Sequence, residues 1–390
     1  MSADAATTPA AAAPKEESFA DSILTKYKTA GEIAASALAE VVKKAVEGAT
    51  LLSLCQAGDA AVEAGTAGVY KSDKKMAKGS AFPTTISINN VICNWAPLPS
   101  DAESSKTLAT GDVVKIQLGA QLDGYPAVAA ETIVVGADAS KPVTGKTADA
   151  IRAAWVGAEV ALRSMKVGAT NTEVSKKVED AIKELGCRAV EGMQTNQFEK
   201  DVIDGKKKVV LAPEPSSRPD TIKLEENEVY GVDITVTTSK EGKPKVDDAR
   251  TTIYKKTGST YLLKMATSRK VFSDVQKKAG AFPFNLRIVE DEKRARMGVQ
   301  ECVSHNLLTP FEALADKEES AVVAQVFLTL ATNSKGAIRL TPAPRWYNGS
   351  GDVVKPDAEV GEATKALLAS AVRQTKTKAK KAKAADVPAA

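Results

Sequence analysis

Histidine is almost absent from this chain of 390 residues, which has one, His305. Histidine is the commonest metal ligand in proteins and a frequent proton carrier, so the chain lacks the residue on which most zinc centres and catalytic triads depend. His305 follows Val299, Cys302 and Val303. We therefore expect it on a helix surface or in the core, and not as a ligand.

Several other patterns are missing. The four cysteines, Cys55, Cys93, Cys187 and Cys302, have no CxxC spacing, which argues against a zinc knuckle or a redox pair and favours buried thiols. No glycine spacing typical of a dinucleotide or phosphate loop occurs, so we expect no cofactor. No apolar run reaches about eighteen residues, and residues 1–14 lack the basic start of a signal peptide. We expect a soluble, intracellular protein with no membrane partner.

The charge of the chain is concentrated at one end. The formal net charge is +4, from 53 Lys and Arg against 49 Asp and Glu. Residues 373–383 hold six basic residues and no acidic one. Such a segment has too few apolar residues to fold alone, so residues 371–390 are predicted to be a disordered basic tail. Residues 1–19, rich in alanine and proline, are predicted to be disordered, and residues 20–370 to form one domain.

An internal repeat organises this domain. Residues 107–136 alternate in polarity around Asp123-Gly124, which predicts a β-hairpin. The segment 108–117 matches 224–233 at an offset of 116 residues, and Gly48-Ala49-Thr50 recurs as Gly168-Ala169-Thr170 at an offset of 120. The sequence therefore predicts two copies of a helix, helix and strand-pair unit, at about 20–140 and 145–340.

Helical periodicity supports the repeat. Apolar residues recur at helical spacing at Ile33, Ala37, Val41 and Ala45, and again at Ile151, Trp155, Ala158, Leu162 and Met165. Thr170-x-x-Glu173 is a capping box, and Gly186 marks the end of the helix that it begins. We interpret both apolar stripes as core.

This pseudo-symmetric α/β (α+β) body, with its Phe82–Asn90 strand, resembles the creatinase and aminopeptidase class, and so predicts a pseudo-two-fold "pita-bread" fold. In that class two divalent ions are held by two aspartates, a histidine and two glutamates. The resemblance places the ligand positions on Gln117, Val128, the stretch 192–196, Asp233 and Phe327. A substrate-contacting histidine of the class matches Asn94.

A metal pair does not fit these residues. Only Asp233 carries a charged oxygen donor, and hard divalent ions need several such donors to replace their water. We therefore predict no metal site, no catalytic residue and no enzymatic activity. Asp233 is then a hydrogen-bonded strand residue.

Motifs along the chain narrow the resemblance. They include Thr25-Lys26-Tyr27-Lys28, Ala81-Phe82-Pro83-Thr84, Val202-Ile203-Asp204-Gly205 and residues 290–298. These resemble the proliferation-associated, ErbB-receptor-binding family, whose fungal members are curved-DNA-binding proteins and which is a non-catalytic branch of the type II methionine aminopeptidases. The resemblance covers residues 20–380. It implies binding to RNA and the large ribosomal subunit, in ribosome biogenesis or translation, and a location in the cytoplasm, nucleus and nucleolus.

The resemblance also implies a helical type II insert at about residues 250–308. Between Lys255 and Arg296 the chain has eleven Lys and Arg against four Asp and Glu, with Tyr254, Tyr261 and Phe272 interleaved. Such a density suits phosphate backbones, although a solvated charged face remains the alternative. The candidate nucleic-acid or ribosome contacts are Lys255, Lys256, Lys264, Arg269, Lys270, Lys277, Lys278, Lys293 and Arg294 in the insert, and Arg373, Lys376, Lys378, Lys380, Lys381 and Lys383 in the tail.

Three hypotheses follow. The first is a non-catalytic aminopeptidase fold that binds the large ribosomal subunit and its RNA near the exit of the nascent chain. The second is a transcriptional regulator that reads the shape of curved DNA with the same basic surfaces. The third is an active methionine aminopeptidase, which would require metal at an altered site.

Overall fold

The computed structural model describes residues 21–214, 216 and 219–373. The predictions for residues 1–19 and for the tail lysines from Lys376 to Lys383 lie outside the described residues. No helix in the described ranges is long and apolar enough to cross a lipid bilayer. The helices are α1 (Asp21–Lys44), α2 (Leu51–Gly68), α3 (Gly145–Ser164), α4 (Asn171–Glu184), α5 (Ala266–Lys278), α6 (Glu292–Ser304) and α7 (Glu362–Ala369).

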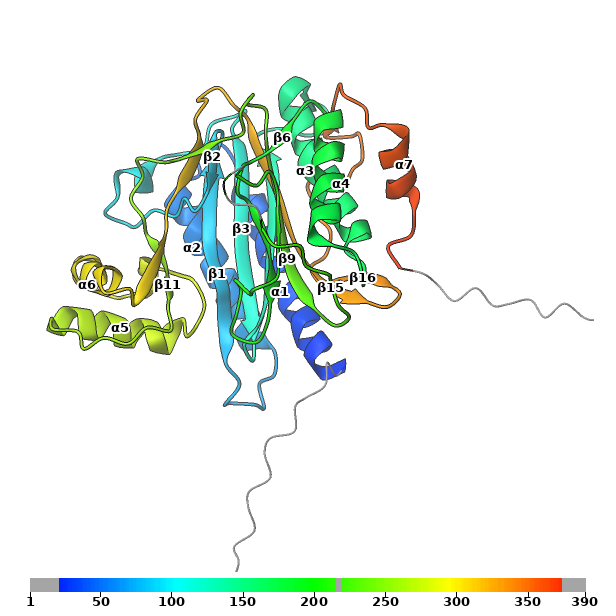
Figure 1. Cartoon of the computed structure of the whole chain (residues 1–390). Helices are drawn as coiled ribbons and strands as arrows, with labels where there is room; N and C mark the ends of the chain where they lie inside the picture. Colours follow the sequence, from blue (N-terminus) through cyan, green and yellow to red (C-terminus); the bar gives the residue numbers. More distant parts are fainter. Residues whose placement is uncertain (1–20, 215, 217–218, 374–390) are drawn as a thin grey trace, which may run out of the picture.

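A large antiparallel sheet forms the centre of the molecule (Figure 1). Its strand order is β1-β3-β4-β15-β9-β7-β8, with β16 paired to β15 and β6 to β9. These strands are β1 (Lys78–Ile88), β3 (Val113–Leu122), β4 (Tyr125–Val134), β6 (Arg188–Ala189), β7 (Gln194–Phe198), β8 (Lys208–Val210), β9 (Val229–Thr237), β15 (Val323–Asn333) and β16 (Gly336–Arg339). The shorter strands are β2 (Val91–Cys93), β5 (Val143–Thr144), β10 (Pro244–Val246), β11 (Ile253–Lys256), β12 (Phe284–Asn285), β13 (Leu308–Phe311), β14 (Leu314–Asp316) and β17 (Val354–Lys355).

The predicted hairpin is confirmed as β3 and β4, which pair from Val113 with Val134 to Leu122 with Tyr125. Asp123 and Gly124, between the strands, have φ angles of 55° and 81°. Positive φ at both central residues gives a turn whose twist matches that of the two strands. Asp-Gly tolerates this conformation, and the register of every side chain in the hairpin depends on it.

The two halves of the chain make matching backbone contacts. The Gly48 amide donates to the Leu108 carbonyl and the Gly168 amide to the Leu224 carbonyl, both at 2.8 Å. Thr170 begins α4 with the predicted capping box, in which its hydroxyl accepts from the Glu173 amide and the Glu173 carboxylate accepts from the Thr170 amide. Gly168 follows Gly48 by 120 residues and Leu224 follows Leu108 by 116 residues, which are the two offsets of the internal repeat.

The main helices, α1 and α3, cover one face of the sheet. Helix α1 packs on β3 and β4, and α3 packs on β9 and β15 (Figure 1). The predicted stripe of α1 is buried, and so is that of α3 apart from Trp155, which is half-buried. Strand side chains alternate between faces, so Ile116 and Leu118 join the core beneath α1 while Gln117 between them faces the other way. The second face of the sheet is therefore free to form a site.

The segment between β11 and β13 stands apart from the large sheet, and it contains α5 and α6 (Figure 1). Val271 and Val275 of α5 pack on Ala295, Val299 and Cys302 of α6 in a hydrophobic cluster separate from the core beneath α1 and α3. Phe282 and Phe284 are buried. We call residues 253–311 the insert.

Candidate functional site

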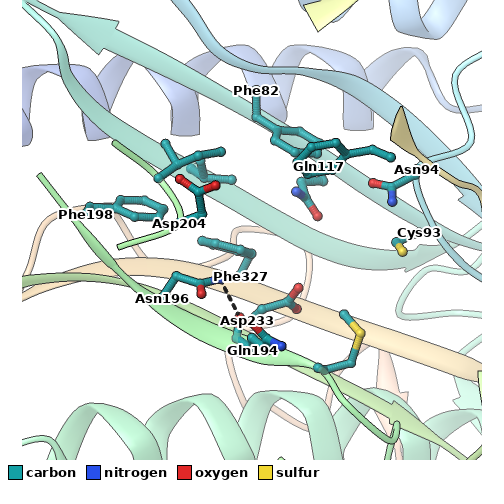
Figure 2. A pocket seen from close by; sticks show the side chains of 14 residues that line it. Phe82, Cys93, Asn94, Gln117, Gln194, Asn196, Phe198, Asp204, Asp233 and Phe327 are labelled. Atoms are coloured by element: carbon teal, nitrogen blue, oxygen red, sulfur yellow. Dashed lines mark hydrogen bonds between the residues drawn. The ribbon is translucent and has the colours of Figure 1, made fainter. Parts of the chain in front are cut away.

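A pocket lies on the face of the sheet opposite the main helices. Its cavity volume is about 190 Å³. Figure 2 shows side chains from several strands converging on it, with Phe198 and Asp204 toward one end and Cys93 and Asn94 toward the other. The lining residues are Phe82, Cys93, Asn94, Gln117, Val128, Met193, Gln194, Asn196, Phe198, Ile203, Asp204, Asp233, Phe311 and Phe327.

The positions that the sequence matched to metal ligands meet in this pocket. Gln117 and Val128 reach it from β3 and β4, and Asp233 and Phe327 are register partners on β9 and β15. The stretch where the histidine was expected contributes Met193, Gln194 and Asn196. The sequence analysis therefore identified positions that meet in one pocket. Most of the side chains at these positions differ from the metal ligands of the aminopeptidase class.

Asp233 is buried and is held by two donors. The Thr235 hydroxyl donates to its Oδ1 at 2.8 Å, and Gln325 Nε2 donates to the same oxygen at 2.9 Å. The amide of Gln325 also donates to Gln117 Oε1 at 3.0 Å. One amide therefore bridges Gln117 and Asp233, two of the positions matched to metal ligands. Burial raises the pKa of Asp233 to about 6, and the two hydrogen bonds oppose this shift.

Divalent metal ions do not fit this arrangement. Gln117 offers a neutral amide oxygen that already accepts from Gln325, and neither Val128 nor Phe327 has a donor atom. The Phe327 ring stacks on Phe198 with ring centroids 6.4 Å apart, so a hydrocarbon wall stands at the fifth ligand position. Within the described ranges no three His, Cys, Asp or Glu side chains are grouped so as to hold a metal ion.

Other polar groups at the pocket have structural partners. Asn94, at the position of the substrate-contacting histidine, donates to the Glu312 carbonyl at 2.9 Å. Asp204 at the rim accepts from Lys255 Nζ at 2.6 Å. Lys115, two residues before Gln117, is buried and donates to the carbonyls of Asn89 and Val323, and burial lowers its pKa to about 7. Cys93, expected to be buried, is instead half-buried at the pocket.

The candidate basic contacts of the insert differ in their environments. Lys255 is mostly covered and bound to Asp204, and Lys256 is half-buried. Arg287, which contributes to the positive count of this region, is not a surface charge, because it forms a buried ion pair with Asp59 at 2.7 Å. The remaining candidates in the insert are exposed, namely Lys264, Arg269, Lys270, Lys277, Lys278, Lys293 and Arg294.

Some exposed basic residues also have partners. Arg269 donates to the carbonyls of Leu263 and Lys264, Lys278 donates to the Ile288 carbonyl, and Arg294 pairs with Asp291. The structure does not bring Arg373 to this surface. Arg373 follows α7, on the opposite side of the large sheet from the insert (Figure 1).

The aromatic residues of the insert are mostly internal. Tyr254 and Phe272 pack against the hydrophobic cluster of the insert, so only Tyr261 of the three is exposed. Its ring stacks on His305, with centroids 3.6 Å apart. His305 lies at the end of α6, which agrees with the expectation of a helix-surface histidine. Leu262, Met265 and Met297 are also exposed, so the insert presents apolar as well as basic side chains.

Comparison with known proteins decides the family. Residues 25–243 match the model of metallopeptidase family M24. The chain is 42% identical over 363 residues to a curved DNA-binding protein of Schizosaccharomyces pombe, covering 92% of this chain and 93% of that protein. It is 41% identical over 322 residues to an ErbB-3 binding protein 1 of Solanum tuberosum, covering 82% and 81%. The chain belongs to the metallopeptidase M24 family, in the branch of curved DNA-binding and ErbB-3-binding proteins.

Solved structures agree with this family. A structure of a thermophilic Arx1 matches with a TM-score of 0.84 and 33% identity, over 91% of this chain and 100% of that one. A methionine aminopeptidase from Thermotoga maritima matches with a TM-score of 0.56 and 16% identity, over 83% and 97%. The second likeness concerns the fold alone. Both the M24 match and these neighbours confirm the predicted pita-bread fold.

Proposed function

We propose that this chain is a non-catalytic M24 protein that docks on the large ribosomal subunit through ribosomal RNA, in ribosome biogenesis or translation near the nascent-chain exit. The observation that carries this proposal is the positive charge exposed on the insert. Its exposed Lys and Arg side chains include Lys264, Arg269, Lys270, Lys277, Lys278, Lys293 and Arg294. We further propose that the protein occurs in both the cytoplasm and the nucleus, including the nucleolus.

The physical basis is counterion release. Each Lys or Arg that neutralises a phosphate frees a condensed counterion, so a dense cationic surface binds RNA with little sequence preference. The apolar cluster of α5 and α6 fixes the spacing of these charges. A preformed cationic face spends little conformational entropy on binding, because the helices that carry it are already ordered.

The pocket supports the non-catalytic part of the proposal. Asp233 is the single carboxylate among the matched ligand positions, and Val128 and Phe327 fill space where donors would be needed. A methionine-alanine-serine peptide should release no methionine above the protein-free control with added cobalt or manganese. Turnover that increases with protein concentration would instead support an active peptidase.

Cosedimentation with purified large ribosomal subunits across a salt series tests the docking. Reversing Arg269, Lys270 and Lys277 to glutamate should weaken binding at least about tenfold, because three cations no longer neutralise phosphates and repulsion is added. A matched control reverses Lys176, Lys177 and Lys183, which are exposed on α4, and should leave binding nearly unchanged. Equal weakening in the two triple variants would show that only net charge matters, and the insert would not be the docking surface.

One observation favours a second candidate, because the relative from Schizosaccharomyces pombe is named for curved DNA. A shape-reading transcriptional regulator could use the same cationic face, since the phosphate backbone presents similar charge in DNA and RNA. Competition separates the two functions. Unlabelled large subunits should displace curved duplex from the protein under the first proposal, and curved duplex should displace large subunits under the second.

A further inference from the structure

A second concave site is lined by residues of α3 and β16, and shares no lining residue with the pocket. Its cavity volume is about 720 Å³. Its walls are largely apolar and come from Trp155 and Leu162 of α3, Ile338 of β16, and Val372. Arg339 also lines this site, which we call the Arg339 groove.

The Arg339 groove has more positive than negative charge. Glu159 binds two guanidinium groups, since its Oε1 accepts from Arg339 Nη2 and its Oε2 accepts from Arg163 Nη1. Arg373 adds a third guanidinium at the exposed rim. The lining residues therefore include one carboxylate, Glu159, whereas three arginines lie in or beside the groove.

Arg339 is incompletely bonded. Its Nη1 atom is buried and, among the described residues, has no hydrogen-bond partner. Burial is the main cause that lowers the pKa of Arg339, and the charge of Arg163 lowers it further. A guanidinium has five N–H donors in a planar fork, and leaving buried donors unused costs free energy. An incoming anion would satisfy this group once the half-buried Arg339 side chain turns its Nη1 toward the groove.

We propose that the Arg339 groove binds a partner protein through an acidic, apolar peptide segment, whose carboxylate bonds the Arg339 guanidinium while a neighbouring apolar side chain packs on Trp155 and Ile338. Carboxylates match the guanidinium fork geometrically. The Trp155 ring is held in place by backbone, because a Cβ on Gly349 would lie 2.6 Å from it.

The wall composition favours peptide over nucleic acid. Phosphate backbones are usually bound by exposed Lys and Arg and by backbone amides, whereas apolar walls around a charged anchor are typical of protein interfaces. A peptide can place one carboxylate at Arg339 and leave an apolar neighbour against the walls.

The full chain can be titrated into a short fluorescein-labelled peptide of alternating leucine and glutamate, with fluorescence anisotropy and tryptophan emission as readouts. The same peptide with glutamine in place of glutamate should bind at least about tenfold more weakly. Arg339→Met should reduce affinity for the acidic peptide by about tenfold, and Arg373→Glu, an exposed change that leaves the fold intact, by about threefold. Arg188→Glu on β6, exposed and outside the groove, is the charge-matched control and should have no effect.

Two results would overturn the proposal. Equal affinity for the glutamate and glutamine peptides, or equal reductions of affinity in the Arg373→Glu and Arg188→Glu variants, would show that the groove does not select a carboxylate. Tighter binding of a single-stranded RNA oligonucleotide, weakened by Arg339→Met, would assign the groove to nucleic acid.

Discussion

At the scale of single residues, Asp233 carries a charge that the fold disfavours. Its pKa is raised from 3.8 to about 6, chiefly by burial. Between these values the folded state holds a proton that the unfolded state releases, so stability falls as pH rises from about 4 to about 6. Above about pH 6 the buried charge of Asp233 lowers the free energy of unfolding by its full amount, up to about 3 kcal/mol.

Asp233→Asn should therefore stabilise the protein at neutral pH. The variant keeps an oxygen that accepts from Thr235 and Gln325, and it removes the buried charge. We expect its free energy of unfolding to exceed that of the wild type by up to about 3 kcal/mol at about pH 7.5, and the two to converge near pH 4. Urea unfolding at several pH values measures this difference. Asp180→Asn, on the exposed side of α4, should show no such dependence. If Asp233→Asn made the protein less stable at neutral pH, a cation would have to compensate the charge of Asp233.

Residue roles that depend on distant pairing escaped sequence reasoning. Gln325 bonds both Gln117 and Asp233, and this requires β15 to pair with β9 across 92 positions of sequence. A lone glutamine in an apolar strand gives no periodic pattern that would reveal such a bond. Arg287 was counted with the surface charge of its region for the same reason, because its partner Asp59 lies 228 positions earlier.

At the scale of elements, Arg287 fastens the insert to the body. Its guanidinium donates to Asp59 on α2 and to the carbonyls of Thr84 and Pro97. Arg287→Met removes these donors and leaves buried acceptors unpaired, so we expect the free energy of unfolding to fall by about 3 kcal/mol. The substitution should also increase the rate of amide hydrogen exchange more in α5 and α6 than in β3.

The control for this variant is Arg294→Met, which removes an exposed pair with Asp291 within the same insert. Such pairs contribute about 0–1 kcal/mol. Similar small decreases in both variants would show that apolar contacts, and not Arg287, hold the insert in place.

Elements defined by local chemistry were predicted well. The β3–β4 hairpin follows from alternation around Asp-Gly, and the start of α4 follows from Thr170 and Glu173, because each involves neighbours along the chain. The positions of the pocket were found through resemblance to known enzymes, and the structure brings them together. Physical periodicity alone would not have joined β3, β4, β9 and β15, since their order in the sheet is a tertiary property.

At the scale of the whole molecule, the insert and α7 lie on opposite sides of the large sheet (Figure 1). The basic segment that begins at Arg373 follows α7 in the sequence, so phosphates can be neutralised at two separate regions of the chain. Salt dependence of ribosome binding can detect this, because the slope of log K against log salt falls by about 0.7–0.9 for each phosphate that is no longer neutralised.

Reversing Arg269, Lys270 and Lys277 should reduce that slope by about 2 to 3. A chain ending at Arg373 lacks the five later lysines, and should reduce it by about 4 if all five bind phosphates. When both regions bind phosphates, combining the two changes gives the sum of the two reductions, because contributions from independent sites add. An equal slope, in magnitude, for the truncated chain with and without the three reversals would mean that the insert binds no phosphate, and that the basic segment after Arg373 accounts for the affinity.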